Sequence, residues 1–281
     1  NPKIPEFDIP NDVENKDSLR WFHSYNYNKQ HYFDNVKISD VRLLRTPIFH
    51  KKMDYYFKKV LMQNPDTLIK YMDKFIDDVR HSDELYSYSI KYFINNFQGT
   101  KIMGLDKVFV HVAQKYYLSG DADWISEETL QNLRKNVAKI KPNLIGEVAH
   151  DLKMETNTGE YARLHDITAN YTLVYFWEPN CGHCKKTTPK IYDLYEKYNR
   201  NEFDVFVVYT QRDKTEWLEY LNKNKFDWTN VYDPYNLTNF RLFYNIYSTP
   251  TIYLLDKDKK IIAKRIDYKT LGKILEQEIG H

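Results

Sequence analysis

Two thiols three positions apart are the residues of this chain best suited to chemistry. Cys181 and Cys184, its only cysteines, lie in the segment FWEPNCGHCKKTTP (176–189). Such a pair can be a redox couple, half of a metal site, a haem attachment or an inert buried pair. A haem attachment requires His directly after the second cysteine, where this sequence has Lys. The haem interpretation is therefore excluded.

Two non-redox interpretations remain, and both have less support than a redox couple. A zinc site needs four ligands, and without a second cysteine pair only His150 or His165 would be left to complete it. An inert pair would have to fall by chance at a junction between a strand and a helix. We therefore predict no metal, and no cofactor besides the redox-active disulfide Cys181–Cys184.

The residues around the pair give the two thiols different roles. TLVYFW (172–177) is typical of a buried strand, EPN is a short loop, and a helix is expected to begin at Cys181. A helix N-terminus carries about half a positive charge and unpaired N–H groups, which stabilise a thiolate. Cys184 follows one turn later and is expected to be more buried. We predict Cys181 as the attacking nucleophile and Cys184 as the resolving thiol.

The dipeptide between the cysteines, Gly182-His183, is expected to tune this chemistry. His183 can add positive charge or a hydrogen bond near the Cys181 sulfur and so favour the thiolate. A stabilised thiolate stabilises the reduced form, which makes the disulfide a stronger oxidant than a Gly-Pro dipeptide would. The dipeptide therefore leaves the direction of electron flow open.

A second feature is the sequence Ser248-Thr249-Pro250 directly before the run TIYLLD (251–256). A proline at the mouth of a strand often marks a cis peptide bond, and this one would face the cysteine loop. The backbone of Thr249 would then offer an edge to which an extended substrate can pair. The simpler alternative is a trans proline that starts an edge strand.

Downstream of about residue 141, β-rich runs alternate with helical segments. The runs are 172–177, 203–209, 228–233, 251–256 and 260–266, and the helical segments lie near 182–198, 213–224, 237–244 and 269–278. This alternation predicts an α/β domain over 142–281, with a central mixed sheet and helices on both faces. The polar turn Lys257-Asp258-Lys259 is expected to join the last two strands in a hairpin.

Upstream of about residue 141, the sequence has a helical pattern. Apolar residues recur at three- and four-residue spacing in 48–61, 66–79, 84–97, 107–118 and 126–140. Five or six amphipathic helices with short loops predict an all-α bundle over 21–141. Residues 1–20 hold three prolines and many charges with little periodicity, so we predict an extended lead-in or linker.

The charge composition of the chain argues against one class of binding partner, nucleic acid. The 281 residues include 41 basic and 39 acidic side chains, interspersed, for a net charge of +2, so no nucleic-acid partner is expected. No apolar run approaches the roughly 18 residues of a membrane-spanning helix. The sequence starts at Asn1 rather than Met, so we expect a processed or trimmed product.

Residues 143–281 resemble the thioredoxin-fold thiol–disulfide oxidoreductases of the extracytoplasmic type that includes the TlpA and ResA proteins, which are AhpC/TSA-like. The matching segments are IGEVAHDL (145–152), GEYARLHDI (159–167), the cysteine segment with Trp177 and Pro189, and STP with Pro250. The region 21–141 is similar to the helical domain that precedes such modules in Bacteroidetes proteins.

The resemblance implies an enzyme that exchanges disulfides with protein substrates and uses a membrane electron donor. It implies Trp177 as a further tuning residue and Thr249 and Pro250 as substrate-binding residues. Because such proteins are commonly exported and lipid-anchored, we expect a periplasmic or membrane-anchored protein whose N-terminal lipoprotein signal is absent from this sequence.

Three features depart from the family's pattern. Tyr175 stands where thioredoxins carry a buried Asp, and Thr187 where ResA-like proteins often carry a Glu that takes the proton of the resolving thiol. Glu178 and Glu147 are candidates for that role, although we expect exposed positions for both. The Gly-His dipeptide is that of protein disulfide isomerases.

Three functions follow as hypotheses. The first is a reductase of protein disulfides, and the second is an oxidase or isomerase with the same chemistry. The third is a partner-binding protein whose helical domain carries the function, suggested by tyrosines on predicted helix faces: Tyr55, Tyr56, Tyr86, Tyr88 and Tyr92. Packing of these tyrosines between the helices is the simpler explanation.

Overall fold

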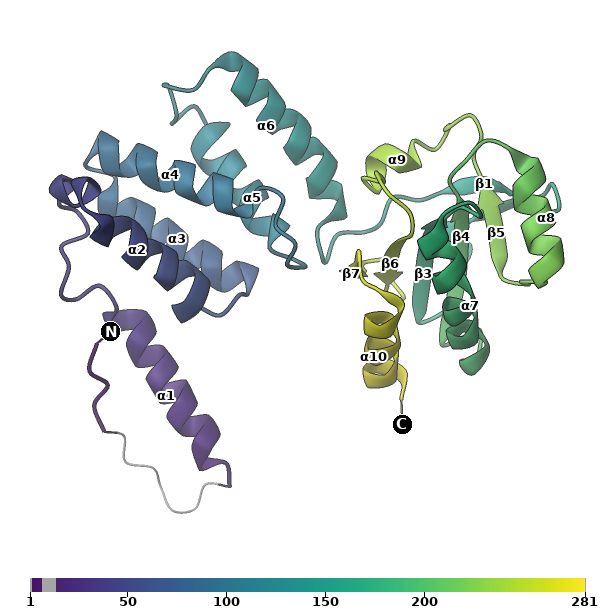
Figure 1. Cartoon of the computed structure of the whole chain (residues 1–281), viewed down its shortest axis with the longest axis horizontal. Coiled ribbons are helices and arrows are strands. Elements are labelled where there is room, and N and C mark those ends of the chain that lie inside the picture. The colour runs from purple at the N-terminus through teal and green to yellow at the C-terminus, as the bar shows by residue number, and fades with distance from the viewer. Residues whose placement is uncertain (1, 7–13, 281) are drawn as a thin grey trace. The chain divides into compact units, whose positions relative to one another are not determined.

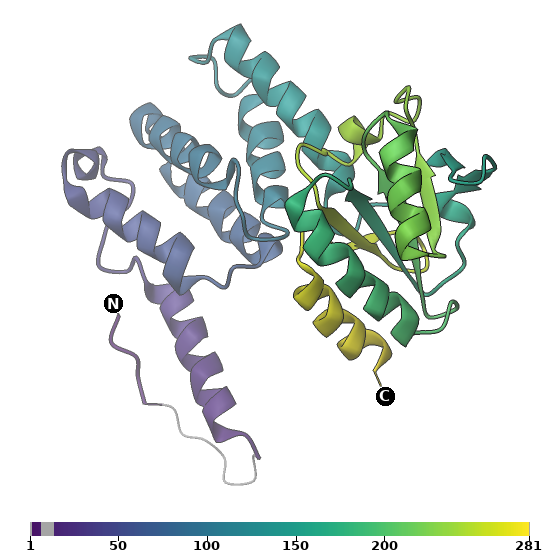
Figure 2. The same cartoon turned by 45° about the vertical axis from the view of Figure 1, so that its right-hand side comes forward.

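The structure is a computed structural model that describes residues 2–6 and 14–280 (Figures 1 and 2). The chain divides into two compact units, the first ending at Leu130 and the second beginning at Gln131. This division falls inside helix α6 (Glu127–Ile140), ahead of the boundary near 141 predicted from the sequence. Among the described residues, no helix is both long and apolar enough to cross a membrane.

The first unit consists of helices, as predicted. They are α1 (Lys16–His31), α2 (Pro47–Tyr55), α3 (Pro65–Val79), α4 (Asp83–Phe97), α5 (Asp106–Val112) and the start of α6. The side chains of Thr46, Asn64 and Ser82 each accept a hydrogen bond from a backbone N–H of the helix that follows. Pro47 and Pro65 occupy first helical positions, where no N–H is needed. Local capping thus fixes where these helices begin.

Helix α1 begins earlier than the sequence indicated. The Asn15 side chain accepts a hydrogen bond from the Ser18 N–H at 3.0 Å, and the helix starts at Lys16. The predicted extended lead-in over 1–20 is therefore wrong for residues 16–20, and residues 1 and 7–13 of it lie outside the described part of the chain. The first turn of α1 is polar, so the apolar period becomes visible only from Trp21 onward.

Aromatic rings fill the centre of the helical unit. Phe57, from the π-helical turn after α2, has its ring centroid 4.6 Å from that of Phe93 in α4, at an interplanar angle of 81°. Phe75 of α3 lies edge-on to Phe57 at 5.7 Å. Edge-to-face contacts of this kind stabilise a core beyond the area that they bury.

The tyrosines that suggested a binding surface mostly pack inside. Three of the five are buried: Tyr56, Tyr86 and Tyr92. Tyr88 is half-buried, and Tyr55 is exposed. The Tyr92 hydroxyl donates to the Asp54 carboxylate at 2.9 Å. This packing removes most of the surface on which the partner-binding hypothesis rests.

The second unit is built on a seven-stranded mixed sheet with the order β2-β1-β5-β4-β3-β6-β7. Its strands are β1 (Lys153–Thr156), β2 (Tyr161–Arg163), β3 (Tyr171–Trp177), β4 (Phe203–Tyr209), β5 (Thr229–Tyr232), β6 (Thr251–Leu255) and β7 (Ile261–Lys264). Strands β3, β4 and β5 are parallel, and the other pairings are antiparallel. The β6–β7 hairpin turns at residues 257–259, as predicted.

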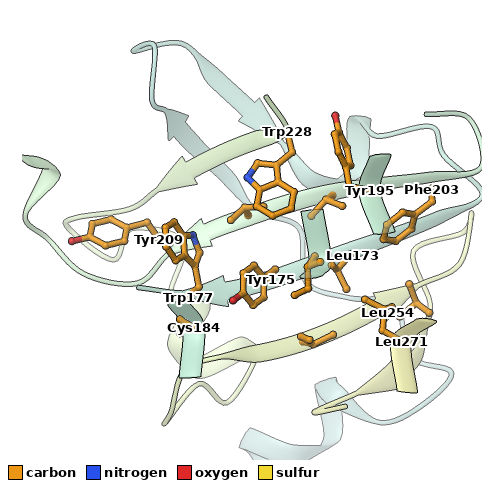
Figure 3. Packing of buried hydrophobic residues seen from close by; sticks show 14 of the residues in the cluster. Leu173, Tyr175, Trp177, Cys184, Tyr195, Phe203, Tyr209, Trp228, Leu254 and Leu271 are labelled. Carbon is orange, nitrogen blue, oxygen red and sulfur yellow. The ribbon is translucent and has the colours of Figure 1, made fainter. Parts of the chain in front are cut away.

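Both faces of the sheet are covered, but unequally (Figure 1). Residues of α7 (Gly182–Lys197), α8 (Lys214–Asn224) and α10 (Tyr268–Ile279) share one core cluster with Tyr175 and Trp177 of β3 (Figure 3). Helices α7 and α8 lie on the same face because right-handed crossovers β3-α7-β4 and β4-α8-β5 advance in one direction across the sheet.

The second face of the sheet carries less helix. The alternate β3 residues, Val174 and Phe176, pack with the short helix α9 (Phe240–Phe243) and with residues of the segment before β1, including Ala149 and Leu152. The prediction of helices on both faces is confirmed, with irregular chain supplying part of the cover on the second face.

Candidate active site

The first cysteine lies at the junction between strand β3 and helix α7. Cys181 is the N-cap of α7, with φ −78° and ψ 117°. Its sulfur accepts a hydrogen bond from the Cys184 N–H at 3.2 Å, and its carbonyl accepts one from the Lys185 N–H at 3.0 Å. The sulfur takes the place of the oxygen that usually caps a helix, where a negative charge is stabilised.

The two thiols have opposite environments. Both are free, but Cys181 is partly exposed and Cys184 is fully buried. Burial raises the pKa of Cys181, but hydrogen bonds from the Cys184 thiol and from the N–H groups of Cys184 and His183 outweigh it and leave the pKa lowered. Burial, together with the neighbouring Cys181, raises the pKa of Cys184. Cys181 is therefore the accessible thiol that ionises first.

The loop before β6 faces the cysteines. The Thr249–Pro250 peptide bond is cis, and the Cys181 thiol donates to the Thr249 carbonyl at 3.4 Å. This proximity follows from the sheet register, because Phe176 of β3 pairs with Thr251 of β6. The residues after β3 and those before β6 therefore meet at one end of the sheet. Thr249 and Pro250 are both half-buried.

The dipeptide between the cysteines is exposed. The backbone N–H of His183 helps to lower the pKa of Cys181, while the His183 side chain is exposed. At Gly182, an added Cβ would meet no atom within 4 Å, so steric crowding does not require glycine there. The side chains between the cysteines thus leave the mouth of the site open.

Trp177 lies in the core rather than on the exposed side of the cysteines. Its side chain is fully buried, with its ring centroid 5.1 Å from that of Tyr220 and 6.5 Å from that of Tyr175. Figure 3 shows Trp177 at the same end of the core cluster as Cys184. Trp177 therefore helps to exclude water from around Cys184.

A chain of hydroxyl groups that sequence reasoning missed connects β3 to Cys184. The Thr188 hydroxyl donates to the Cys184 carbonyl at 2.8 Å, and the Tyr175 hydroxyl in turn donates to the Thr188 oxygen at 2.9 Å. Burial raises the pKa of Tyr175, which keeps it protonated as a donor. The i, i+4 spacing of Cys184 and Thr188 was the available signal, because threonine in a helix often bonds the carbonyl four residues back. Thr187 lies beside this chain and is half-buried.

Of the two candidate carboxylates, Glu178 is the one at the site. Its Oε1 accepts a hydrogen bond from the Thr249 hydroxyl at 2.7 Å, and its Oε2 accepts one from the Gln211 side chain. Glu178 is half-buried, so the exposed position expected from the sequence is wrong for it. Glu147 is exposed, and its carbonyl accepts the N–H of Ile261 in β7.

The described residues contain no group of three His, Cys, Asp or Glu side chains placed to hold a metal ion. The two histidines that a zinc site would require have other contacts. His150 stacks on Phe243 with ring centroids 3.6 Å apart, and His165 Nε2 bonds the Ala149 carbonyl at 2.9 Å.

Comparisons with known proteins agree with this geometry. A thioredoxin-like family model matches residues 169–261, and the model of a domain of unknown function (DUF5106) matches residues 8–143. The chain is 30% identical over 121 residues to a thioredoxin-like protein of Haemophilus influenzae, an alignment that covers 43% of this chain and 70% of that protein. It is 27% identical over 126 residues to the thiol-disulfide oxidoreductase ResA of Bacillus cereus, an alignment that covers 45% of this chain and 72% of ResA.

A solved structure extends the likeness to the whole chain. The thioredoxin-like protein from Bacteroides caccae aligns with a TM-score of 0.66 and 19% identity over 98% of each chain, which shows a shared fold. Taken together, the family models, the two sequence relatives and this shared fold confirm the resemblance to thioredoxin-like thiol–disulfide oxidoreductases inferred from the sequence. The chain belongs to the thioredoxin-like proteins, with a carboxy-terminal domain of the thiol–disulfide oxidoreductase type that follows a helical domain.

Proposed function

We propose that this protein is an extracytoplasmic oxidoreductase that acts on protein disulfides by cycling Cys181 and Cys184 between dithiol and disulfide. One observation carries the proposal: the Cys181 sulfur caps α7, with a lowered pKa, 3.4 Å from the carbonyl of Thr249. An accessible thiolate therefore lies beside a backbone edge to which an extended peptide can pair.

The reaction begins when the Cys181 thiolate attacks one sulfur of a substrate disulfide. The Cys181–substrate bond forms, the substrate disulfide breaks, and its second sulfur leaves as a thiolate. Cys184 then attacks Cys181 Sγ, so that the Cys181–Cys184 disulfide forms and the first substrate sulfur leaves as a thiolate. The substrate gains two electrons and the protein dithiol loses two.

We propose the reducing direction as the physiological one, with a membrane electron donor that regenerates the dithiol. The similarity to ResA and the resemblance to TlpA proteins support both the direction and the extracytoplasmic location. Protein disulfides exposed in an oxidising compartment would be the substrates.

An oxidase or isomerase is the second candidate. The lowered pKa of Cys181 and the Gly182-His183 dipeptide favour it, because a stabilised thiolate stabilises the reduced form and raises the reduction potential. The reduced form of such an enzyme would reactivate a scrambled, disulfide-containing substrate, because the Cys181 thiolate can attack the non-native disulfides. A protein that reduces insulin disulfides but does not reactivate the scrambled substrate would contradict this candidate.

Trapping of a mixed disulfide tests the proposal directly. The Cys184→Ser variant, expressed in its native compartment, is expected to accumulate substrates joined through Cys181, because the resolving thiol is missing. Cys181→Ser is the matched control and should accumulate none. Equal trapping by both variants, or none by either, would contradict the assigned roles.

A further inference from the structure

The helical unit contains a cavity that the proposed function does not use. Its volume is about 710 Å³, and its lining residues come from the last turn of α1, from the segment that follows α1 and from α3. Cavities of roughly 300–1,000 Å³ are the usual size of small-molecule sites in proteins. The size of this cavity therefore suits a small ligand.

Apolar side chains form much of the cavity wall. Four of them are half-buried: Phe33, Val36, Ile38 and Tyr71. The ring of Tyr56 also lines the cavity, and its centroid lies 4.8 Å from that of Phe33 and 6.4 Å from that of Tyr71, at interplanar angles of 62° and 74°. Aromatic ligands pack against rings in edge-to-face or offset-stacked arrangements. The wall thus favours a ligand with an aromatic body.

Positive charge exceeds negative charge around the cavity. Four lysines and two aspartates line it: Lys29, Lys37, Lys70, Lys74, Asp34 and Asp78. One member of each set already has a partner, because Lys29 donates to the Asn26 side chain at 2.8 Å and Asp34 lies 2.7 Å from His31 Nδ1. The remaining charge of the lining favours an anion over a cation.

Two of these lysines form a distinct pair on α3. Lys70 and Lys74 are four residues apart on one face of the helix, and both are exposed. Neither makes a hydrogen bond or an ion pair with another residue in the described part of the chain. Like charges at this spacing destabilise a helix. An anion bound between the two ammonium groups would relieve their repulsion.

We propose that this cavity binds a small aromatic anion. The ring system lies against Phe33 and Tyr71, and the anionic group lies between Lys70 and Lys74. A lysine ammonium is a compact charge with three donors, so it accepts a carboxylate, a sulfonate or a phosphate in this place. The cavity and the two cysteines belong to different units, so the inference does not rest on the proposed dithiol chemistry.

Calorimetric titration of the full chain with 2-naphthoate tests the proposal. We expect saturable binding of one molecule per chain, with a Kd of about 1 mM or lower. The neutral analogue 2-naphthalenemethanol, which has the same rings, should bind about tenfold more weakly because it lacks the charge. Added salt should weaken binding of 2-naphthoate and leave that of the neutral analogue unchanged, since salt screens exposed charges.

Matched variants locate the site. Lys70→Gln combined with Lys74→Gln should lower the affinity for 2-naphthoate about tenfold and remove its salt dependence. Lys135→Gln combined with Lys139→Gln is the control, because these lysines are also exposed and four residues apart, on α6 and outside the cavity. The control pair should bind as the wild type does.

The aromatic contact has its own variant. Tyr71→Leu keeps an apolar side chain but removes the ring, so the affinity for 2-naphthoate should fall about two- to tenfold. Circular dichroism of each variant checks that the helices are retained.

Three results would overturn the proposal: no saturable binding of 2-naphthoate, equal affinity for the neutral analogue, or an equal loss of affinity in the control pair. An acidic peptide that binds through Lys70 and Lys74 while 2-naphthoate does not would overturn the small-molecule ligand. Each of these results leaves the dithiol function intact, because formation of the Cys181–Cys184 disulfide is measured separately.

Discussion

At the residue scale, the sulfur of Cys181 caps helix α7, while that of Cys184, one turn further on, is fully buried. Hydrogen bonds to the first sulfur and burial of the second move their pKa values in opposite directions. An attacking thiol must ionise and be reached, whereas a resolving thiol must be held back until the mixed disulfide forms. Here the two cysteines meet these requirements because one turn of helix separates the partly exposed Cys181 from the fully buried Cys184.

Alkylation of the reduced protein should show this difference. Iodoacetamide is expected to label Cys181 first, at a rate that rises with pH through a midpoint below the roughly 8.5 of free cysteine. The thiolate fraction grows as the pH rises through the lowered pKa of Cys181, while the raised pKa of Cys184 keeps it a thiol. Peptide mass spectrometry gives both rates. Equal rates are expected only in denaturant, and faster labelling of Cys184 in the folded protein would contradict the assignment.

At the element scale, β3 and α7 are joined by the hydroxyl chain from Tyr175 through Thr188 to the Cys184 carbonyl. The first turns of α7 carry both cysteines, and Pro189 interrupts the backbone hydrogen bonding further along the helix. The side-chain link to β3 therefore helps to keep this part of the helix against the sheet.

Two substitutions measure the strength of this link. Thr188→Val should lower the free energy of unfolding by about 1–3 kcal/mol, because it leaves the buried Tyr175 hydroxyl without a partner. Tyr175→Phe removes only one partner of a hydroxyl that still bonds Cys184, so about 0.5–1.5 kcal/mol is expected. Denaturant unfolding of the reduced protein gives both values. A larger cost for Tyr175→Phe than for Thr188→Val would contradict the order of donors in the chain.

The sequence predicted the elements well where periodicity and length were clear, as in α3 and β4. It failed at the start of α1, where the first turn is polar and the cap, Asn15, resembles any loop residue. At the site, local motifs predicted the position of Cys181 at the start of α7 and the cis bond between Thr249 and Pro250. The contacts of Glu178 could not, because its partners Gln211 and Thr249 lie 33 and 71 positions away and meet it only through the sheet register.

At the scale of the whole molecule, buried tyrosines occur in both units. Burial raises the pKa of Tyr56, Tyr92 and Tyr116 in the helical unit and of Tyr175 and Tyr244 in the thioredoxin-like unit. Unfolding exposes these hydroxyls to water, where their pKa returns to about 10. The two units therefore share a sensitivity to alkali.

Stability should fall at high pH for this reason. Below about pH 10 the tyrosines are protonated in both states, and above it the unfolded chain loses protons that the folded chain retains, so the free energy of unfolding decreases. Denaturant midpoints followed by circular dichroism, between about pH 8 and pH 11, should decline in this window. A midpoint that stays constant to pH 11 would contradict the burial of these hydroxyls.

The reduction potential of the Cys181–Cys184 pair tests the central claim most directly. Titration of the full chain against defined thiol–disulfide buffers, followed by alkylation and mass spectrometry, is expected to show one two-electron transition. For a reductase its midpoint should be more negative than about −180 mV. Absence of a two-electron transition would contradict the redox function itself. A midpoint near about −120 mV, typical of strong oxidants, would contradict the reducing direction.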